Sequence, residues 1–168
     1  MISPTKSDFE HLLVYRAEFE ECGSHLDGTA DLASFARVED WFAAMTQGMD
    51  EATVRPGRVA ASTYLAVREG DGHLVGMVNI RYRLNDFLLH LGGHIGYSVR
   101  PSERRKGYAK TMLRLALDAC RSMGLKRVLL TCDRDNIASA KTIRANGGVL
   151  ENEVPEGRRT TQRYWIVL

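Results

Sequence analysis

The feature that most constrains the fold is a strong amphipathic helix between two strand-like segments. Over residues 107–123, apolar side chains recur on one face with a period of about 3.6 residues, and Gly124 provides a C-terminal stop. The preceding segment "HIGYSV" (94–99) has a strand pattern and is stopped by Pro101. The following segment "RVLLTC" (127–132) is a near-continuous apolar run, typical of a strand buried on both faces. These segments indicate an α/β domain.

The remaining segments extend this pattern to the order ααβββαβαββ. The other expected elements are helices over 4–23 and 32–49, strands over 62–70 and 74–84, a short helix over 137–145, and strands over 149–154 and 163–168 around the turn "PEGRR". The stretch 85–93 is apolar enough to be buried but is interrupted by Asn-Asp and Gly-Gly, so its structure is left open. A chain of 168 residues has room for one domain, and we predict a single α/β domain over 1–168 with a mixed sheet.

Composition excludes several classes of protein. A hydrophobic fraction of 44% and a charged fraction of 26% are those of a globular chain that needs no disulfide or metal to hold its core. No apolar run reaches the ~18 residues of a membrane span, and the N-terminus lacks a signal-peptide core, so no membrane partner is expected. Cys22, Cys120 and Cys132 are odd in number and widely spaced, which predicts reduced thiols in a cytoplasmic protein and no metal site.

The positive charge is concentrated in one loop. Residues 98–110, "SVRPSERRKGYAK", hold five basic residues and one acidic one, a local charge of 5 − 1 = +4, while the formal net charge of +2 leaves 2 − 4 = −2 for the rest. The loop precedes a helix N-terminus, where free backbone N–H groups and the helix dipole favour an anion. A phosphate or pyrophosphate ligand is therefore expected, with a merely solvated charged loop as the alternative. Neither the Walker pattern nor the three-glycine dinucleotide fingerprint is present.

The same loop carries a family resemblance. "VRPSERRKGYAKTMLRLAL" resembles motif A of the GNAT N-acetyltransferase superfamily, whose core is Gln/Arg-x-x-Gly-x-Gly/Ala, with Arg104, Gly107 and Ala109 at the three defined positions. The similarity is clearest over 93–150, and the chain is also similar to a group of bacterial predicted acetyltransferases without an assigned substrate. The resemblance implies a GNAT-like α+β fold with a mixed, mostly antiparallel sheet of six to seven strands and about four helices.

The resemblance also implies acetyl-CoA as cosubstrate. Backbone N–H groups of residues 104–109 would hold its pyrophosphate, and the strand ending at 97–99 would pair with its pantetheine arm. A backbone N–H near Val99 would polarise the thioester carbonyl, a contact commonly worth ~3 kcal/mol. Asn136 is the family's usual contact to the cofactor arm, and it equally suits the N-cap of the following helix. The expected cofactor-binding residues are Tyr97, Ser98, Val99, Arg104, Arg105, Lys106, Gly107, Tyr108, Ala109 and Asn136.

The implied reaction is direct attack of an amine on the thioester in a ternary complex, so a base or a water relay must remove the amine proton. His94 is the first candidate for this base, because it stands where many family members carry a glutamate and its ordinary pKa of ~6.5 suits the task. A histidine that is only hydrogen-bonded at a strand start is the alternative reading. His90 and Glu103 are weaker candidates for the base.

The general acid is where the chain departs from the family. Many members carry a tyrosine seven residues after the Asn, but here that position is Ile143, which cannot donate a proton, with Ser139 at the family's usual small-residue position. Two alternatives stay open: another tyrosine (97, 108 or 164) donates, or no acid is needed because a thiolate with a pKa near ~8.5 is a tolerable leaving group.

We therefore predict an acetyl-CoA-dependent N-acetyltransferase acting on a primary amine of a small molecule or protein; the alternative is a CoA-binding sensor or partner module with little turnover. The acceptor site is expected in segments 20–60 and 83–93, and the acceptor's identity is open. No nucleic-acid partner is expected, because aromatic residues are not interleaved with the loop's cations. Dimerisation is common in the family and is expected here. "MIS" leaves little room for the family's first strand, so that sheet edge is one strand short or covered by a partner chain.

Overall fold

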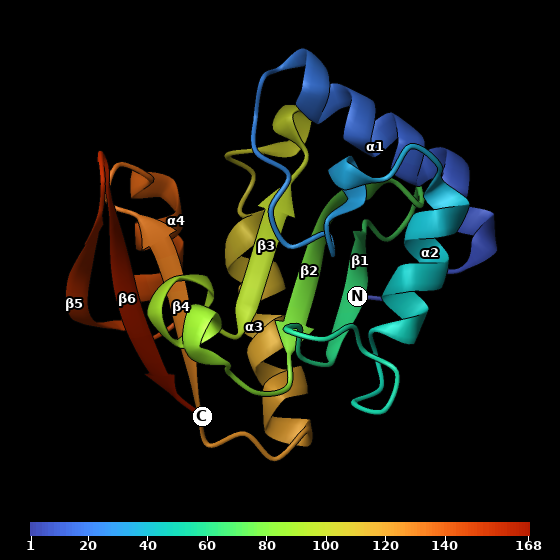
Figure 1. Ribbon diagram of the computed structural model, residues 1–168. Helices are drawn as coiled ribbons and strands as arrows, with labels where there is room; N and C mark the ends of the chain where they lie inside the picture. The colour runs from blue at the N-terminus through green and yellow to red at the C-terminus, as the bar shows by residue number, and fades with distance from the viewer.

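Two three-stranded antiparallel sheets form the centre of the molecule, in a computed structural model that describes all 168 residues (Figure 1). The strand orders are β1-β2-β3 and β4-β6-β5. The strands are β1 (Ala61–Val67), β2 (Leu74–Arg81), β3 (Ile95–Val99), β4 (Arg127–Asp133), β5 (Val149–Glu156) and β6 (Arg159–Val167). The predicted α/β class and the order ααβββαβαββ are confirmed, with six strands; the expected mixed sheet is split in two, and every ladder within it is antiparallel.

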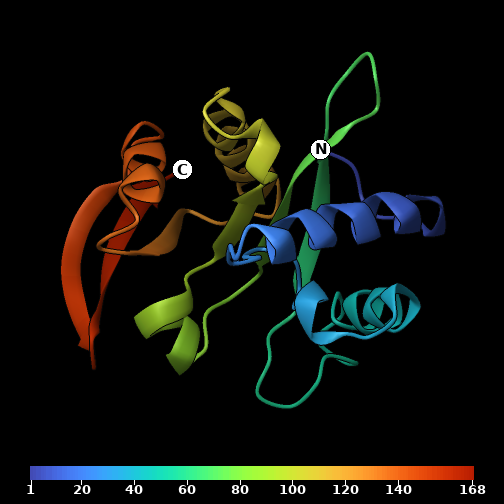
Figure 2. The same cartoon turned by 90° about the horizontal axis from the view of Figure 1, so that it is seen from above.

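Four α-helices cover the sheets: α1 (Phe9–Glu21), α2 (Val38–Gln47), α3 (Tyr108–Ser122) and α4 (Ile137–Arg144). Helices α1 and α2 lie on one face of the first sheet and α3 lies on the other (Figure 2), while α4 contacts α3 and β4. Short 3-10 turns occur at Lys6–Asp8, Leu32–Ser34 and Pro101–Glu103, and the ambiguous stretch 85–93 contains a π-helical turn at Leu88–Gly92. None of the helices has the length and apolar character needed to cross a membrane.

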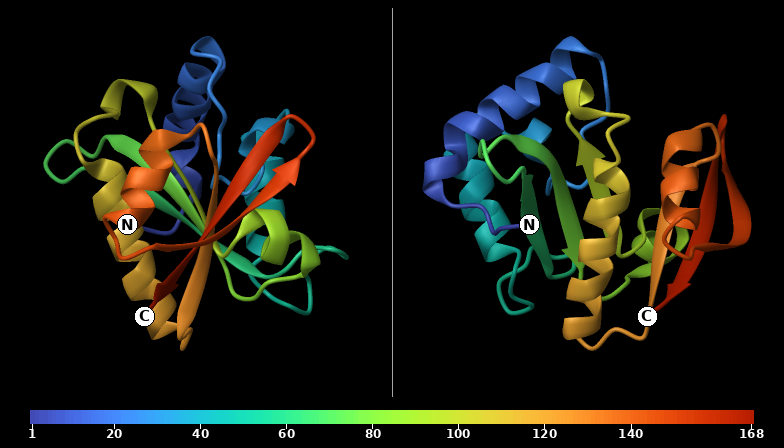
Figure 3. Two further views of the ribbon diagram at one scale, coloured as in Figure 1. Left: turned by 90° about the vertical axis from the view of Figure 1, so that its left-hand side faces the viewer. Right: turned by 180° about the vertical axis from the view of Figure 1, so that it is seen from behind.

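Two apolar cores hold the first sheet from both faces. The larger core lies between α3 and the sheets and includes Val78 and Leu113; Cys120 and Cys132 also belong to it, as free thiols. The smaller core lies under α1 and α2 and is centred on Trp41, which is fully buried. Burial of each such side chain stabilises the fold by about 2 kcal/mol. The first sheet is therefore the anchored layer, and Figure 3 shows α3 packed across its rear face.

The two sheets meet at the start of β3. The backbone N–H of His94 donates to the carbonyl of Leu129 at 2.7 Å, and the N–H of Leu129 donates to Nδ1 of the His94 ring at 2.9 Å. Gly93 permits this approach, because it has φ +64° and a Cβ there would lie 2.6 Å from the Leu129 oxygen. From this point β3 and β4 run in the same direction and diverge toward their C-terminal ends (Figure 1).

The helix expected over 32–49 is wrong in its first turns. Leu32–Ser34 forms a separate 3-10 turn, and α2 begins only at Val38. Between the 3-10 turn and α2, Phe35 and Arg37 have extended backbone, with ψ values of 129° and 135°. An α-helix cannot continue through extended residues, because it needs ψ of about −42° at each position.

Two predictions at the sheet edges are also resolved by the structure. The turn "PEGRR" is shorter than expected, because β5 and β6 stay paired up to Glu156 and Arg159, and Gly157, with φ +60°, supplies the reversal. The family's first strand is reduced to one antiparallel bridge between Ile2 and Leu65, with N–H to carbonyl distances of 2.9 and 2.8 Å.

Candidate active site

A cavity of about 1230 Å³ lies between the diverging strands β3 and β4. Its lining also includes the loop before α3, the start of α4 and the segment after α1. Of the expected cofactor-binding residues, those that line it are Tyr97, Ser98, Val99, Arg104, Arg105, Gly107, Tyr108, Ala109 and Asn136. Lys106 is absent from this lining. The fold thus gathers residues from distant parts of the chain around one space.

The loop before α3 presents a row of free backbone donors. The N–H of Arg104, which was expected to take part, donates instead to the carbonyl of Pro101 at 3.3 Å, whereas none of the N–H groups of residues 105–110 donates to a protein acceptor. Arg105 and Gly107 have φ values of 65° and 87°, and alternation of left- and right-handed residues turns successive N–H groups toward one concave side. The positive end of the α3 dipole adds to this field. The arrangement suits an anion of phosphate or pyrophosphate size.

The cations of this loop divide into two groups. The carboxylate of Glu103, only 7% exposed, pairs with Lys106 and with Arg68, each at 3.0 Å. The Lys106 hydrogen bond is the largest cause that lowers the pKa of Glu103 below its usual range. Arg104 and Arg105 form no ion pair and line the cavity. The ion pair with Glu103 is the physical reason that Lys106 does not line the cavity, and only part of the local charge of +4 faces this space.

Strand β3 offers free backbone groups on its cavity side. The N–H of Arg100 donates to the carbonyl of Val75 at 2.9 Å, which fixes the parity of the β2–β3 ladder. Because antiparallel pairing alternates, the N–H groups of Tyr97 and Val99 then point away from β2, toward β4. These groups can pair with an extended ligand arm or donate to a carbonyl oxygen.

The start of α4 brings two hydroxyls together in the cavity. Asn136 caps the helix, since its Oδ1 accepts the backbone N–H of Ser139 at 3.1 Å, as predicted. The Tyr97 hydroxyl lies 2.9 Å from Oγ of Ser139. Burial raises the pKa of Tyr97 to about 12, so this hydroxyl keeps its proton at neutral pH.

The structure separates the alternatives for a proton donor. Ile143 is fully buried in the larger core. Tyr97 and Tyr108 line the cavity, whereas Tyr164 does not: its hydroxyl donates to Oε1 of Gln162 at 2.6 Å in the protein interior. Tyr164 is thereby removed from the candidates.

His94 occupies a structural position. It is 6% exposed and does not line the cavity between β3 and β4, and its ring lies edge-on to the Trp165 ring, with 6.3 Å between the ring centroids. Because Nδ1 accepts the Leu129 N–H, the neutral ring carries its proton on Nε2, and neither nitrogen has a free lone pair. Burial, followed by the charge of Arg81, lowers the pKa of His94 to about 4. This geometry does not support the predicted role of His94 as general base. It agrees with the alternative, a hydrogen-bonded histidine at a strand start.

The weaker base candidates have other partners. Nδ1 of His90 lies 2.6 Å from the carbonyl oxygen of Asp86 on an exposed turn. Glu103 is held in its ion pairs with Arg68 and Lys106.

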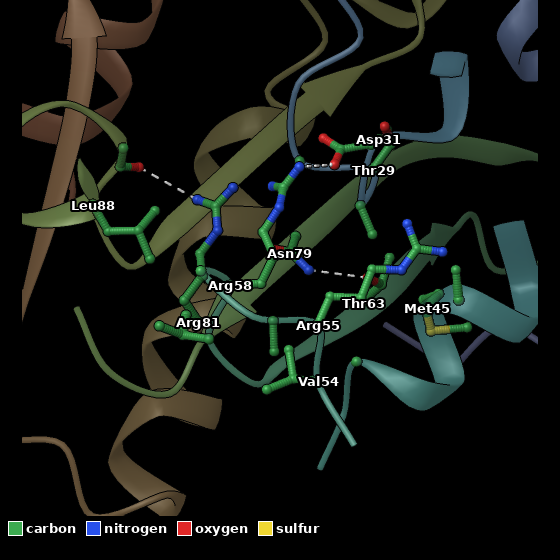
Figure 4. Close-up of a pocket in the computed structure, with 18 of the residues that line it drawn as sticks. Thr29, Asp31, Met45, Val54, Arg55, Arg58, Thr63, Asn79, Arg81 and Leu88 are labelled. Carbon is green, nitrogen blue, oxygen red and sulfur yellow. Dashed lines mark hydrogen bonds and ion pairs between the residues drawn. The ribbon is translucent and has the colours of Figure 1, made fainter. Parts of the chain in front are cut away.

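A second cavity, of about 570 Å³, lies on the α1–α2 side of the first sheet (Figure 4). Most of its lining comes from the segments 20–60 and 83–93, where the acceptor site was expected, together with residues of β1 and β2. Asp27, Gly28, Arg81 and Gly92 line both cavities. The two spaces therefore adjoin, and a molecule in one can meet a molecule in the other.

Residues 1–149 match the family described as an acetyltransferase (GNAT) domain. The chain belongs to the GNAT acetyltransferase family. Among proteins with curated descriptions, none matches this GNAT sequence.

Solved structures share the GNAT fold. A ribosomal-protein-alanine acetyltransferase from Vibrio fischeri is 18% identical, with a TM-score of 0.71 over 98% of this chain and 90% of the other. A mutant spermidine N-acetyltransferase from Vibrio cholerae is 16% identical, with a TM-score of 0.64 over 98% and 92%. A GNAT-family protein from Bordetella pertussis is 17% identical, with a TM-score of 0.68 over 98% and 92%. At these identities the similarity shows the fold and not the acceptor.

Sequence reasoning missed the two charged residues shared by both cavities of this GNAT protein. Asp27 lies in a loop without a motif, and Arg81 ends a strand whose pattern indicates only burial. The one available signal for Arg81 was a charged residue directly after the apolar run of the strand expected over 74–84. Asp27 and Arg81 are far apart in the sequence, so only the fold shows that they line the same two cavities.

Proposed function

We propose that this protein transfers the acetyl group of acetyl-CoA to a primary amine. The observation that carries the proposal is the row of free N–H groups over residues 105–110, at the edge of a cavity between the diverging strands of a GNAT fold. No group of three or more His, Cys, Asp or Glu side chains gathers in a way that could hold a metal ion. We also propose a cytoplasmic location, from the odd, widely spaced cysteines, and a homodimer, from the resemblance alone.

The residues present fit acetyl-CoA. The free N–H groups of 105–110, with Arg104 and Arg105 beside them, would bind the pyrophosphate. The N–H groups of Tyr97 and Val99 would pair with the pantetheine arm and donate to the thioester oxygen. When bound, acetyl-CoA supplies an acyl group on a thiolate leaving group.

The chain's own residues account for the protons. As the N–C bond forms and the C–S bond breaks, the amine must lose a proton and the departing sulfur must gain one. Asp27 is the carboxylate that lines both cavities, and we assign it to binding the incoming amine and passing its proton to water. Tyr97, paired with Ser139, is the donor that we assign to the sulfur.

Calorimetry and a thiol-release assay test the proposal together. Acetyl-CoA should bind, and CoA thiol should then appear continuously with at least one member of a panel of primary amines. Arg104→Glu and Arg105→Glu place negative charge beside the pyrophosphate and should weaken binding, whereas Arg114→Glu, on the exposed part of α3, is the matched control. Absence of binding at millimolar acetyl-CoA would falsify the proposal. Binding without sustained turnover on any amine, peptide N-termini included, favours the alternative of a CoA-binding module.

A further inference from the structure

Arg81 is a guanidinium without an anionic partner. It is the last residue of β2, it is only partly exposed, and its one hydrogen bond is from Nη1 to the carbonyl of Gly92 at 3.3 Å. No carboxylate lies within ion-pair distance of it, although Asp31 and Asp27 contribute at longer range. A guanidinium has five N–H donors, and because Arg81 lines both cavities, the donors that Gly92 does not engage are available to a ligand. Burial lowers the pKa of Arg81, so the surroundings disfavour the charged guanidinium, and a bound anion would stabilise it.

The second cavity as a whole carries excess positive charge. Its lining holds three arginines, at positions 55, 58 and 81, and two aspartates, at positions 27 and 31. Asp31 is already engaged with Arg58 at 2.7 Å, whereas Arg55 forms no ion pair. Figure 4 shows the three arginine side chains around the same space, with the Arg58–Asp31 contact drawn. Such a lining repels a polycation and attracts an anionic group.

Arg81 also lies at the junction of the two cavities. A Cβ added to Gly96 of β3 would lie 3.2 Å from Nη1 and 3.3 Å from Nη2, so the guanidinium rests against the strand assigned to the pantetheine arm. Asp27, which lines both cavities as well, provides a negative group in the same region. A ligand that bridges a carboxylate and a guanidinium here is an amine that also carries an acid group.

We propose that the acceptor of this enzyme is an amine bearing a carboxylate, with Arg81 binding the carboxylate and Asp27 facing the ammonium. The inference rests on the proposed function and specifies its acceptor. The bond changes are unchanged: the amine nitrogen bonds to the acetyl carbon, the C–S bond breaks, and the carboxylate remains unaltered in the N-acetyl product. The planar fork of Arg81 matches a carboxylate through two parallel hydrogen bonds.

Pairs of amines that differ only in the carboxylate test the proposal. L-Tyrosine is compared with tyramine, L-leucine with isopentylamine, and L-lysine with cadaverine, and spermidine is added as a polycation; thiol release gives kcat/KM for each. The acid-bearing member of a pair should be preferred. Arg81→Gln should lower kcat/KM for that member by roughly 10- to 100-fold, as expected for loss of a charge-assisted pair, and leave its decarboxylated partner nearly unchanged. Arg83→Gln is the matched control, since Arg83 is exposed, pairs with Glu51 and lines neither cavity.

A binding measurement gives a second readout that needs no turnover. N-Acetyl-L-leucine and N-acetyl-L-tyrosine, which are products under the proposal, should bind the wild-type protein in calorimetry and bind Arg81→Gln more weakly. Arg81→Lys keeps the positive charge and should retain part of the affinity for the N-acetyl amino acids. It provides the comparison if Arg81→Gln does not fold.

The outcomes separate the two proposals. Equal or better rates with the decarboxylated amines, or an equal loss for both members of a pair in Arg81→Gln, would overturn the carboxylate acceptor while leaving acetyl transfer intact. Failure of wild-type protein to bind either N-acetyl amino acid at millimolar concentration would also overturn it. Absence of acetyl-CoA binding is the different result that removes the proposed function itself.

Discussion

The imidazole of His94 accepts the backbone N–H of Leu129 at 2.9 Å, and the backbone N–H of His94 donates to the Leu129 carbonyl at 2.7 Å. This reciprocal pair is located where β3 and β4 begin to diverge. One residue therefore joins the two sheets at the closed end of the cavity assigned to acetyl-CoA. The sequence suggests His94 as a general base, but the contact observed for its side chain is one that joins the two sheets.

His94→Ala should destabilise the fold by about 2–4 kcal/mol, because it leaves the Leu129 N–H unsatisfied and opens space beside Trp165. Urea unfolding measures this change. His90→Ala is the control, since His90 is exposed and contacts only a carbonyl of its own turn, and it should cost under ~0.5 kcal/mol. If His94→Ala instead abolished turnover with unchanged stability, the structural role would be rejected and the general-base role restored.

Acid should weaken the fold through the same histidine. The folded-state pKa of His94 is about 4, because of burial and then the nearby Arg81 cation, against an unfolded value of ~6.5. Between these values the unfolded chain binds more protons, so the free energy of unfolding falls as pH drops through this window, by at most ~3 kcal/mol from this group. Unfolding curves at pH 7 and pH 4.5 should differ less for His94→Gln than for the wild type. An identical pH dependence in the two proteins would contradict this assignment.

Neighbouring cations of the basic loop should differ in their effect on acetyl-CoA. Arg105→Ala should weaken binding by roughly 3- to 10-fold and reduce its salt dependence, because Arg105 lines the cavity without an ion pair. Lys106→Ala should change affinity little, since its ammonium is engaged by Glu103 at 3.0 Å. Calorimetry at two salt concentrations distinguishes them. Equal losses would mean that Lys106 leaves Glu103 when the anion binds.

Gly93→Ala should be strongly destabilising, by more than ~3 kcal/mol, because the new Cβ would lie 2.6 Å from the Leu129 oxygen in a left-handed backbone. Gly124→Ala is matched to it, with φ +83° and open space around the added atom, and should cost only ~1 kcal/mol. Thermal unfolding compares the two variants. The difference between the two losses of stability measures the close contact between Gly93 and Leu129, which brings β3 against β4. Similar losses would show that the backbone can shift to accept the added Cβ at little cost.

Tyr97→Phe should lower kcat by roughly 10- to 100-fold with little change in KM, if its hydroxyl protonates the departing sulfur. Tyr164→Phe serves as control, because its hydroxyl is bonded to Gln162 outside the cavity and should affect stability alone. Steady-state kinetics with a good acceptor measures both. Full activity of Tyr97→Phe would show that the thiolate leaves without this donor.

Local sequence patterns were sufficient for the order of elements and for locating the basic loop that is the candidate anion site. The amphipathic period of α3, the apolar run of β4 and the basic loop between Pro101 and Tyr108 are properties of neighbouring residues, so they could be recognised without a fold. The N-cap role of Asn136 belongs to the same class, because capping depends on residues three positions apart.

The remaining features depend on contacts between distant segments. Lys106 is within the motif, yet its ammonium pairs with Glu103, which also pairs with the distant Arg68. Histidine ordinarily has a pKa that suits a base, but Leu129, far along the chain, donates its N–H to Nδ1 of His94, and burial lowers the pKa of the ring to about 4. Arg81 and Asp27 line the same two cavities only because β2 and the segment after α1 both border them.

The sequence by itself thus determined the α/β order, the +4 loop before α3 and the resemblance that leads to acetyl-CoA, because these follow from local periodicity and charge. Tertiary structure alone decided that the sheet divides at His94 and Leu129, which cations line the first cavity and which charges border both cavities. The physical reason is that burial, ion pairing and the direction of a lone pair depend on which distant atoms come within hydrogen-bonding distance.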